Sequence, residues 1–527
     1  MLSNDILSAL KSYTATMQNA VTFVLQTGEH DKRAELLEFL TQVTSTSAHI
    51  NLEERDTGLR SPISFELYTD KATGIQFTGI PSGHEFNSLV LSILWASGTA
   101  MKLDEALQQN IARLDQRVKF EVFVSLDCHN CPDAVQALNQ FALINDNISS
   151  EMIDGGLFQD ELAKRDIQGV PVVFLNGKRF ANGKINISEI VNDLAERFPI
   201  IRQADNQSNL PLQDVTVIGG GPAGTAAAIY SARKGLKVSL IADRIGGQVK
   251  DTMSIENFIS VSSTSGPQLA GDLQAHIDEY DITIKQHVRV DSIENGLHKK
   301  LQLSSGEIIE SKSVILATGA NWRELGIPGE QENVGNGVAY CPHCDGPFFK
   351  GKDVAVIGGG NSGIEAALDL SGIVKSVTVF EFMPELKADS VLVEQTQKRG
   401  NITILKNVAA KQILTEDGKV SAIEYEERQS GANKIQPLAG VFVQIGLIPN
   451  SQLAENLVER TQHGEIIIDE KCQTSEAGIF ACGDVTTVPY KQIVIAMGEG
   501  SKASLAAFEY LLTYNTLSAD TNDNLAA

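Results

Sequence analysis

The sequence is poor in cysteine, in basic charge and in long apolar runs, and each shortage excludes a class of protein. Six cysteines in 527 residues are too few for a disulfide-stapled scaffold. A formal net charge of −23 makes nucleic acid and anionic membranes poor partners. No window approaches the ~20 apolar residues of a membrane span, and the first residues lack the basic and apolar parts of a signal peptide. We therefore expect a cytoplasmic protein that binds neither nucleic acid nor membrane.

Four of the six cysteines stand in C-x-x-C pairs. One pair, Cys341–Cys344, is followed directly by Asp345, and the other is Cys128–Cys131. In a protein without scaffold disulfides, this spacing indicates a redox-active or metal-binding pair. Cys472 and Cys482 have no such partner, and we interpret them as ordinary small strand residues.

Two glycine fingerprints flank the downstream pair. Gly219-x-Gly221-x-x-Gly224 follows a buried strand at 215–218 and opens a helix, and the same unit recurs as Gly358-x-Gly360-x-x-Gly363 after a strand at 353–357. These glycines permit a tight turn and close approach to a pyrophosphate, which then faces the helix N-terminus. We expect two dinucleotide-binding modules in one chain.

The acidic residue of each module predicts its nucleotide. Glu381 stands twenty-one residues past Gly360, where a carboxylate bonds the ribose 2′-hydroxyl of NAD and repels a 2′-phosphate. Residues 382–385 contain no Arg or Lys to hold NADP. In the first module Asp243 is the candidate, although it stands slightly late for that position.

The first ~195 residues carry no glycine fingerprint and alternate strand-like and helix-like runs. A strand at 118–124 precedes Cys128–Cys131, and a helix runs from Pro132 to about Ile144. Val170-Pro171 and the turn Asn176-Gly177 follow. This order resembles the thioredoxin fold, in which the proline is cis and faces the dithiol.

An internal echo precedes this segment. Residues 21–25 again read as a first strand, and a helix follows at about 32–43. Gly79-Ile80-Pro81 parallels Gly169-Val170-Pro171, and Thr27–Asp31 stands where the second unit has its cysteines. We expect a first thioredoxin-like fold without a dithiol.

The combination resembles a known family. Residues from about 212 to 515 resemble bacterial thioredoxin reductase almost throughout, and the tandem thioredoxin-like extension makes the whole chain similar to the flavoprotein (F) component of bacterial alkyl hydroperoxide reductases. The fold class expected is α/β: tandem thioredoxin-like folds followed by a two-dinucleotide-binding-domain (Rossmann-like) flavoprotein disulfide reductase. The resemblance implies FAD, NADH, a homodimer, and a 2-Cys peroxiredoxin, the C component of those reductases, as acceptor.

The expected domain division follows the motifs. The N-terminal part comprises a thioredoxin-like fold without a dithiol (1–103), a thioredoxin-like fold with C-x-x-C (104–197) and a flexible linker (198–210). The remainder comprises the first part of the FAD domain (211–326), the NAD domain with its C-x-x-C (327–446), the second part of the FAD domain (447–515) and a disordered tail (516–527).

The resemblance also implies an electron route from NADH through FAD to Cys341–Cys344 and then to Cys128–Cys131. Asp345 would be the proton donor to the leaving thiolate, and Glu85 matches a family glutamate near the N-terminal dithiol. The expected cofactor-binding residues are Gly219, Gly221, Pro222, Ala223, Gly224, Asp243, Gly247, Gln248, Asn257, Ala317, Thr318, Gly319, Gly358, Gly360, Asn361, Ser362, Gly363, Glu381, Gly483, Asp484, Gln492 and Ile493.

Three other interpretations compete with this one. Four cysteines in two C-x-x-C pairs can bind zinc, although here the pairs lie about 210 residues apart, in different folds. A redox-sensing scaffold could bind a dinucleotide without catalysis. A disulfide reductase could also serve thioredoxin or a glutaredoxin-like protein in place of peroxiredoxin.

Overall fold

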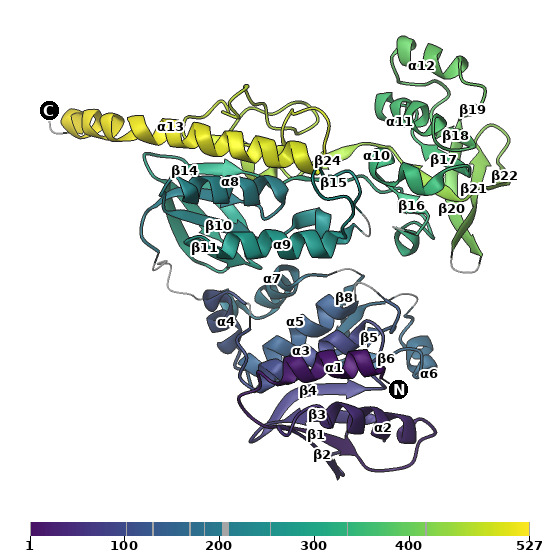
Figure 1. Ribbon diagram of the computed structural model, residues 1–527, viewed down its shortest axis with the longest axis vertical. Coiled ribbons are helices and arrows are strands. Elements are labelled where there is room, and N and C mark those ends of the chain that lie inside the picture. Colours follow the sequence, from purple (N-terminus) through teal and green to yellow (C-terminus); the bar gives the residue numbers. More distant parts are fainter. Residues whose placement is uncertain are drawn as a thin grey trace. The chain divides into compact units, whose positions relative to one another are not determined.

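The protein forms two compact units in the computed structural model (Figure 1). Unit 1 comprises Met1–Leu210, Lys285–Ser292 and Leu301–Ile309, and unit 2 comprises Pro211–Ile284, Ile293–Lys300 and Glu310–Ala527. The structure describes residues 2–101, 103–128, 131–167, 170–183, 185–202, 210–252, 255–334, 336–416 and 419–525, without the side chains of Arg202, Asp251, His343, Cys344 and residues 515–525.

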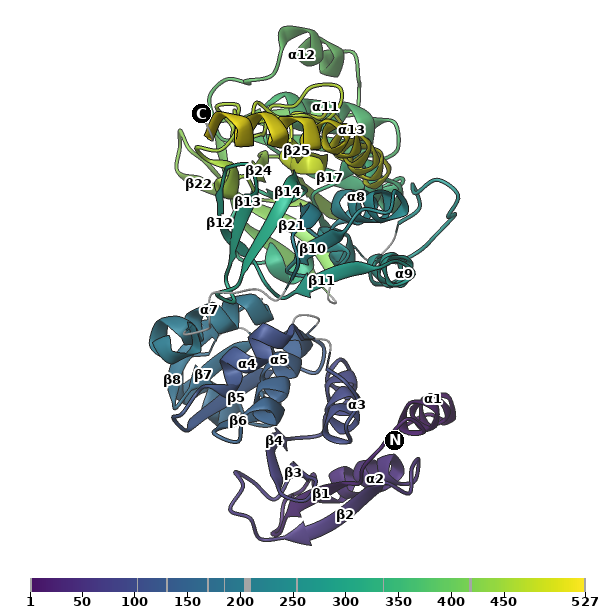
Figure 2. The ribbon, with the colours of Figure 1, turned by 90° about the vertical axis from the view of Figure 1, so that its left-hand side faces the viewer.

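An eight-stranded sheet forms the centre of unit 1, with strand order β2-β1-β3-β4-β6-β5-β7-β8 (Figure 2). Its elements, in chain order, are α1 (Asn4–Thr14), β1 (Val21–Gln26), α2 (Arg33–Thr44), β2 (Ile50–Arg55), β3 (Ser64–Tyr68), β4 (Ala72–Thr78), α3 (Glu85–Ala96), α4 (Glu105–Ala112), β5 (Val118–Val124), α5 (Cys131–Ile144), β6 (Ile148–Asp154), α6 (Gln159–Lys164), β7 (Val172–Leu175), β8 (Lys178–Asn182) and α7 (Ile187–Arg197).

The two halves of this sheet repeat one topology. β1 pairs parallel with β2 and antiparallel with β3, and β5 pairs parallel with β6 and antiparallel with β7. The last two strands of each half are antiparallel neighbours. The expectation of tandem thioredoxin-like folds is confirmed, and parallel pairing of β4 with β6 joins them into one sheet.

One detail of the predicted echo is wrong. Pro171 directly precedes β7, the third strand of its half, whereas Pro81 follows β4, the fourth strand. The topological counterpart of Pro171 is Pro62, which precedes β3. A Cβ at Gly28, in the loop that replaces the dithiol, would lie 2.8 Å from Cγ of Pro62. The equivalence depends on strand order, and the sequence similarity around Pro81 did not reveal it.

Local sequence explains the turns that shape the second half. Asn176 and Gly177 connect β7 to β8 with φ values of 49° and 76°, the left-handed conformation that this dipeptide favours in a two-residue hairpin. Asn186 and Glu189 form a capping box at the start of α7.

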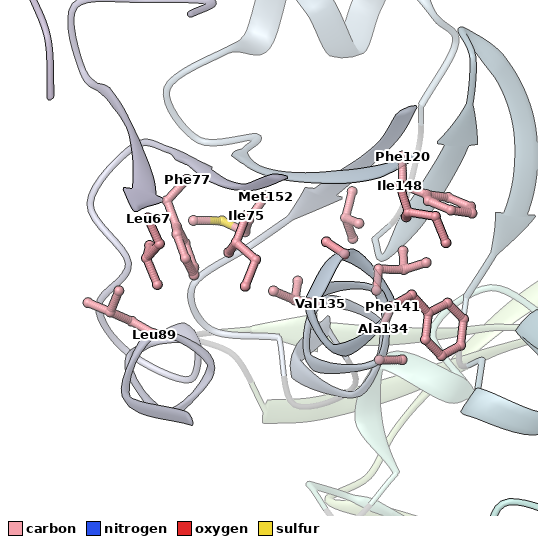
Figure 3. Close-up of a cluster of buried hydrophobic side chains, with 14 of the residues drawn as sticks. Leu67, Ile75, Phe77, Leu89, Phe120, Ala134, Val135, Phe141, Ile148 and Met152 are labelled. Atoms are coloured by element: carbon pink, nitrogen blue, oxygen red, sulfur yellow. The ribbon is translucent and has the colours of Figure 1, made fainter. Parts of the chain in front are cut away.

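The core of unit 1 is continuous across both halves. Side chains from β4, β6 and α5 meet in one cluster, in which Ile75, Met152 and Val135 are fully buried (Figure 3). Because both halves contribute to the same apolar interior, their separation would expose it to water.

A buried ion cluster crosses the same junction. Arg60, from the first half, donates to Glu151 at 2.7 Å and also pairs with Glu121. Arg165 donates to Glu121 at 2.8 Å, and Lys119 lies 2.8 Å from Glu151. Burial alone would raise the pKa of Glu151, but the hydrogen bonds from Arg60 and Lys119 outweigh it and hold the pKa below its ordinary value.

Two further sheets contain the two glycine fingerprints: the first pairs in parallel among β10, β9, β14 and β25 and includes segments 285–292 and 301–309 of unit 1, and the second is parallel throughout. The first has the order β11-β10-β9-β14-β13-β12, with β25 beside β14, and the second has the order β16-β23-β17-β18-β19. Their principal elements are β9 (Gln213–Ile218), α8 (Pro222–Arg233), β10 (Val238–Ala242), α9 (Gly266–Asp278), β11 (Ile282–Gln286), β12 (Val290–Glu294), β13 (Lys299–Leu303), β14 (Ile308–Leu316), β25 (Ile479–Ala481), α13 (Ile493–Leu525), β16 (Val338–Ala339), β17 (Asp353–Ile357), α11 (Asn361–Ser371), β18 (Ser376–Glu381), α12 (Ser390–Gln397), β19 (Ile402–Lys406) and β23 (Gly440–Val443).

Smaller elements complete unit 2. A three-stranded antiparallel sheet is formed by β20 (Val408–Glu416), β21 (Lys419–Glu427) and β22 (Ala432–Pro437). A two-stranded ribbon is formed by β15 (Ala320–Trp322) and β24 (Leu447–Pro449). α13 lies along α8 (Figure 1), and a Cβ at Gly500 would approach the Ala223 carbonyl oxygen to 2.0 Å.

Two predicted segments fall at the margins of the described structure. The expected linker at 198–210 begins with a 3-10 turn at Pro199–Arg202, and residues 203–209 lie outside the described residues. The expected tail at 516–527 overlaps the end of α13, where side chains are described only as far as Tyr514. Among the described helices, none combines the length and the apolar character that a bilayer crossing demands.

We predict that Arg60→Ala lowers the free energy of unfolding of unit 1 by about 3 kcal/mol, because each of two buried carboxylates, Glu121 and Glu151, loses one of its cationic partners. Trp95 on α3 and Trp322 are the two tryptophans of the chain. Urea unfolding followed by tryptophan fluorescence in a Trp322→Phe background therefore reports unit 1. Arg55→Ala, at an exposed arginine of β2, is the control and should change stability by less than about 0.5 kcal/mol. Equal effects of the two substitutions would contradict the prediction.

Candidate functional site

The first glycine loop leaves an opening at the N-terminus of α8. A Cβ at Gly224 would lie 1.8 Å from the Gly219 carbonyl oxygen, and one at Gly219 would lie 2.2 Å from the Ala317 carbonyl oxygen. At Gly221, by contrast, nothing lies within 4 Å. The close contacts at Gly224 and Gly219 hold strand and helix together. Gly221 is open to a pyrophosphate, whose negative charge a helix N-terminus stabilises. The loop fits the bound dinucleotide that its sequence predicts.

Several predicted flavin-site residues converge on this loop. Gly247 packs on Gly221, and Gly483 packs on Ala223, since a Cβ at either would come within 3.0 Å of its neighbour. Pro222 is the first residue of α8. Ala317 is buried at the end of β14.

Other residues predicted for the flavin site meet from distant parts of the sequence. The side-chain amide of Asn257 donates to the side chain of Gln492 at 3.2 Å, across 235 residues of chain. Gln492 directly precedes Ile493, where α13 begins. Gln248 donates to the Ala320 carbonyl at 2.7 Å. Burial raises the pKa of Asp484, and the charge of Lys491 opposes that rise.

Asn450 is a residue of this region that the sequence did not indicate. The Thr318 hydroxyl donates to the Asn450 carbonyl at 2.7 Å, and the Asn450 amide donates back to the Thr318 carbonyl at 2.9 Å. Its backbone N–H also donates to the carbonyl of Gly319. The partners are 132 residues apart, so no local pattern could have linked them.

The second glycine loop repeats the first. A Cβ at Gly363 would lie 1.9 Å from the Gly358 carbonyl oxygen, and Gly360 has nothing within 4 Å. Asn361 ties this loop to the following segment, because its side chain accepts from the backbone of Asp389 and donates to that carboxylate. Ser362 is exposed in the first turn of α11. This loop too fits a dinucleotide.

Glu381 is buried at the end of β18, and its carboxylate accepts two backbone hydrogen bonds. The donors are the N–H groups of Gly359, at 2.5 Å, and Met383, at 2.7 Å. The carboxylate is thereby held in one orientation beside the glycine loop. This is the place at which a ribose-binding acid is expected in the second module.

The first module has no acid at the corresponding position. A Cβ at Gly359 would lie 2.6 Å from the Glu381 carboxylate, whereas a Cβ at Gly220 would lie 2.7 Å from Cβ of Ala242. Ala242 therefore occupies the place of Glu381. Asp243 is half-buried one residue beyond β10, which explains its late position in the sequence.

The downstream dithiol follows β16 directly. Cys341 is disulfide-bonded and half-buried, and the side chain of Cys344, its expected partner, lies outside the described residues. Asp345 ends the short helix α10 (Pro342–Asp345). Burial raises the pKa of Asp345 to about 6, against a hydrogen bond from the Cys341 backbone.

The upstream dithiol is a disulfide at the start of α5. Cys128 is bonded to Cys131, whose backbone N–H donates to the Cys128 sulfur at 3.1 Å. Cys131 is fully buried, whereas Cys128 is half-buried, so Cys128 is the sulfur that a partner can reach. The Val170–Pro171 bond is cis, as expected, and the Val170 carbonyl lies 3.8 Å from the Cys128 sulfur.

Glu85 begins α3 and is fully buried, with no hydrogen bond to either carboxylate oxygen. Burial raises the pKa of Glu85 to about 7. The Ser88 hydroxyl opposes the rise, and the charge of Asp133, in the first turn of α5, adds to it.

The loop before Glu85 contacts the loop before the disulfide. The N–H of His84 donates to the Leu126 carbonyl at 2.9 Å, and a Cβ at Gly83 would come within 2.5 Å of that same oxygen. A carboxyl group of the first half thus stands beside the dithiol loop of the second half.

The two remaining cysteines were expected in strands, but neither lies in one: Cys482 directly follows β25, and Cys472 lies in the segment before it. Cys472 and Cys482 are free and buried, and burial raises the pKa of both thiols. The raised pKa of each thiol disfavours the thiolate that disulfide exchange requires.

Comparison with known proteins agrees with this geometry. Residues 213–500 match the pyridine nucleotide-disulphide oxidoreductase family, and residues 118–196 match the thioredoxin domain. The chain is 45% identical to the F component of alkyl hydroperoxide reductase from Escherichia coli, over 98% of its own length and 100% of that protein. It is 46% identical to a Bacillus subtilis protein named NADH dehydrogenase, over 97% and 99%.

A solved structure matches more than half of the chain. Thioredoxin reductase from Streptococcus pyogenes has a TM-score of 0.55 and 35% identity, and the match covers 57% of this chain and 99% of that one. Matches to the F components of alkyl hydroperoxide reductases span nearly the full chain, including both thioredoxin-like halves. The chain belongs to the pyridine nucleotide-disulphide oxidoreductase family and, within it, to the flavoprotein F components of alkyl hydroperoxide reductase.

Proposed function

We propose that the protein is an NADH-dependent, FAD-containing disulfide reductase that delivers electrons to a 2-Cys peroxiredoxin and so supports reduction of alkyl hydroperoxides and hydrogen peroxide. The observation that carries the proposal is a disulfide on a thioredoxin-like half together with a second disulfide-bonded cysteine beside an NAD-type module in the same chain. The name of the Escherichia coli relative supports a hydroperoxide-reducing system.

Each nucleotide has its own set of proposed ligands. The loop at 219–224, the strand ends near Ala317 and Gly483, and the Asn257–Gln492 pair would hold FAD, and the loop at 358–363 with Glu381 would hold NADH. When bound, the two cofactors supply two electrons from the nicotinamide hydride. The chain's own residues carry those electrons onward as thiolates.

Disulfide exchange then proceeds in balanced steps. The Cys341 thiolate attacks the accessible Cys128 sulfur, the Cys128–Cys131 bond breaks, and Cys131 leaves as a thiolate. The Cys344 thiolate attacks Cys341, which restores the Cys341–Cys344 disulfide and releases Cys128 as a thiolate. Cys128, made acidic by the N-terminus of α5, attacks the peroxiredoxin disulfide, and Cys131 resolves the mixed disulfide.

Two carboxyl groups, the buried Glu85 and the half-buried Asp345, supply protons in this scheme. Asp345, with a pKa of about 6, follows the downstream dithiol directly and protonates its leaving thiolate. Glu85, with a pKa of about 7, serves the upstream dithiol in the same way, because it is buried beside the loop that carries Cys128.

We also propose a homodimer in the cytoplasm. α13 exposes Val494, Leu505 and Leu512, whose spacings of eleven and seven residues place them on one helix face. A second copy is the occupant that would cover this apolar stripe.

The finer domain division of 1–103, 104–197, 211–326, 327–446 and 447–515 remains a prediction.

A reductase that serves thioredoxin or a glutaredoxin-like protein is the second candidate. The similarity of unit 2 to thioredoxin reductase favours it. Steady-state rates of NADH oxidation with each purified acceptor distinguish the two. A rate with peroxiredoxin no higher than that with thioredoxin would reverse the assignment.

NADH should exceed NADPH in flavin reduction by about a hundredfold in kcat/KM, because a 2′-phosphate would meet the buried Glu381 carboxylate. Glu381→Ala should narrow that gap by about tenfold or more, corresponding to ~1.4 kcal/mol. Anaerobic stopped-flow absorbance with each nucleotide measures both ratios. Glu394→Ala, at an exposed glutamate of α12, is the control. Equal rates with the two nucleotides in the wild-type protein would refute NADH specificity.

Single cysteine substitutions should stop electron flow at different steps. Cys128→Ser should abolish transfer to peroxiredoxin but leave reduction of flavin and of Cys341–Cys344 intact. Cys344→Ser should leave hydride transfer intact but block reduction of both disulfides. Anaerobic NADH titration with free-thiol counting tests this order, and Cys472→Ser serves as the control. If Cys344→Ser protein reduced Cys128–Cys131 at the wild-type rate, the series route would be wrong.

The buried Glu85 carboxyl should make unit 1 less stable as the pH rises. Its folded-state pKa of about 7 lies above the value near 4.5 of a free glutamate, so the stabilisation is complete below pH 4.5 and is lost as the pH rises through 7. Glu85→Gln should remove this loss and stabilise unit 1 at pH 8 by about 3 kcal/mol relative to wild type.

Urea unfolding followed by Trp95 fluorescence at pH 5 and pH 8, in the Trp322→Phe background, measures the difference. Glu38→Gln, at an exposed glutamate of α2, should show no such pH-dependent gain. A Glu85→Gln protein with the wild-type pH slope would show that this carboxyl is ionised throughout.

A further inference from the structure

Tyr340 stands between the NAD sheet and the downstream dithiol. β16 ends at Ala339, and Cys341 follows Tyr340 directly. The side chain is half-buried, and its hydroxyl, carbonyl and ring each contact a different segment of unit 2. A residue held at three points can restrict the orientation of the residue that follows it.

The hydroxyl of Tyr340 is held by a buried carboxylate. It donates to Glu330 at 3.0 Å, and Glu330 is only 1% exposed. The same carboxylate accepts from the backbone N–H groups of Leu325, at 2.9 Å, and Gly326, at 2.7 Å. Burial, together with the Glu330 charge, raises the pKa of Tyr340, so its hydroxyl remains a hydrogen-bond donor.

The carbonyl of Tyr340 is held by the segment that supports the nucleotide loop. The Gln444 side-chain amide donates to it at 2.7 Å, from a position directly after β23. A Cβ at Gly358 would lie 2.4 Å from the Gln444 carbonyl oxygen. One residue therefore touches both the first glycine of the NAD fingerprint and the residue before Cys341.

The ring of Tyr340 stacks on the two-stranded ribbon. Trp322 of β15 lies with its ring centre 6.1 Å away at an interplanar angle of 21°. Trp322 is paired with Leu447 of β24. β15 follows the first nucleotide module in the chain and β24 follows the second, so the ribbon belongs to the connection between them.

We propose that Tyr340 is a positioning residue that orients Cys341 for electron transfer, through its contacts with Glu330, Gln444 and Trp322. The inference rests on the proposed role of Cys341–Cys344 as the first electron acceptor in the chain. That dithiol must react with two partners in turn, and a small misalignment of reacting groups costs a large factor in rate. The contacts of Tyr340 restrict the segment that sets this alignment.

Tyr340→Phe tests the proposal with one atom removed. The ring and its stacking on Trp322 remain, while the hydroxyl bond to Glu330 is lost. After anaerobic mixing with NADH, rapid quenching and alkylation, free thiols at Cys341 should appear about tenfold more slowly than in wild type. The initial rate of NADH oxidation, the KM for NADH and the FAD content should be unchanged.

A second measurement distinguishes loss of Cys341 orientation from a general loss of structure around the disulfide. Dithiothreitol reaches the disulfide without a fixed orientation, so thiol formation by dithiothreitol in the absence of NADH should not be slowed. The equilibrium midpoint of the couple in a dithiothreitol redox buffer should also be unchanged. Tyr425→Phe, which removes a phenol hydroxyl from β21, is the matched control and should behave as wild type in every measurement.

The outcomes distinguish the role of Tyr340 from the proposed role of Cys341–Cys344 as the first electron acceptor in the chain. Wild-type protein that forms no thiols at Cys341 with NADH would overturn both. Two results would overturn the role of Tyr340 alone. In the first, Tyr340→Phe forms free thiols at Cys341 as fast as the wild-type protein does. In the second, Tyr340→Phe slows NADH oxidation and thiol formation by the same factor. Gln444→Met removes the amide donor to the Tyr340 carbonyl and should slow the same step. If Tyr340→Phe does not fold, the thiol-formation rate of Gln444→Met decides.

Discussion

Parallel pairing of β4 with β6 is the constraint on which the redox site of unit 1 depends. It brings the carboxyl ends of strands from both halves to one edge of the sheet, so the loop after β4 meets the loop after β5. The residues directly before Glu85 thereby contact the loop that leads to a dithiol that their own half does not contain. Arg60 secures the same junction through ion pairs to the second half. The first half contributes the carboxyl group and the second contributes the sulfurs, and neither half holds both.

Unit 2 repeats one backbone design in its two glycine loops. Both glycine loops use the same close contact between the first and last glycine, and both leave the middle glycine open. The modules differ at the neighbouring strand end, where Glu381 in one corresponds to Ala242 in the other. Because the backbone is shared, we expect discrimination between nucleotides to depend on side chains at the strand ends, and Glu381 also holds the loop through the N–H of Gly359.

Local patterns predicted the features that depend on local geometry. Glycine spacing located both loops, and Asn176-Gly177 located a hairpin, since few other residues adopt those backbone angles. Contacts across long separations were different. Thr318 and Asn450 share no local pattern, and the convergence on Tyr340 became visible only in the fold. The error at Pro81 has the same origin, because Pro171 precedes the third strand of its half whereas Pro81 follows the fourth.

The contact between Gly28 and Pro62 limits what the first half of unit 1 can become. Gly28 has a φ of +127°, and any Cβ there would be forced into the proline ring. A cysteine at position 28 would need a new backbone path and a displaced proline as well as a new sulfur. The backbone of the first half therefore does not accommodate a thiol side chain at position 28. A point substitution at that position cannot give the first half the dithiol that the second half carries.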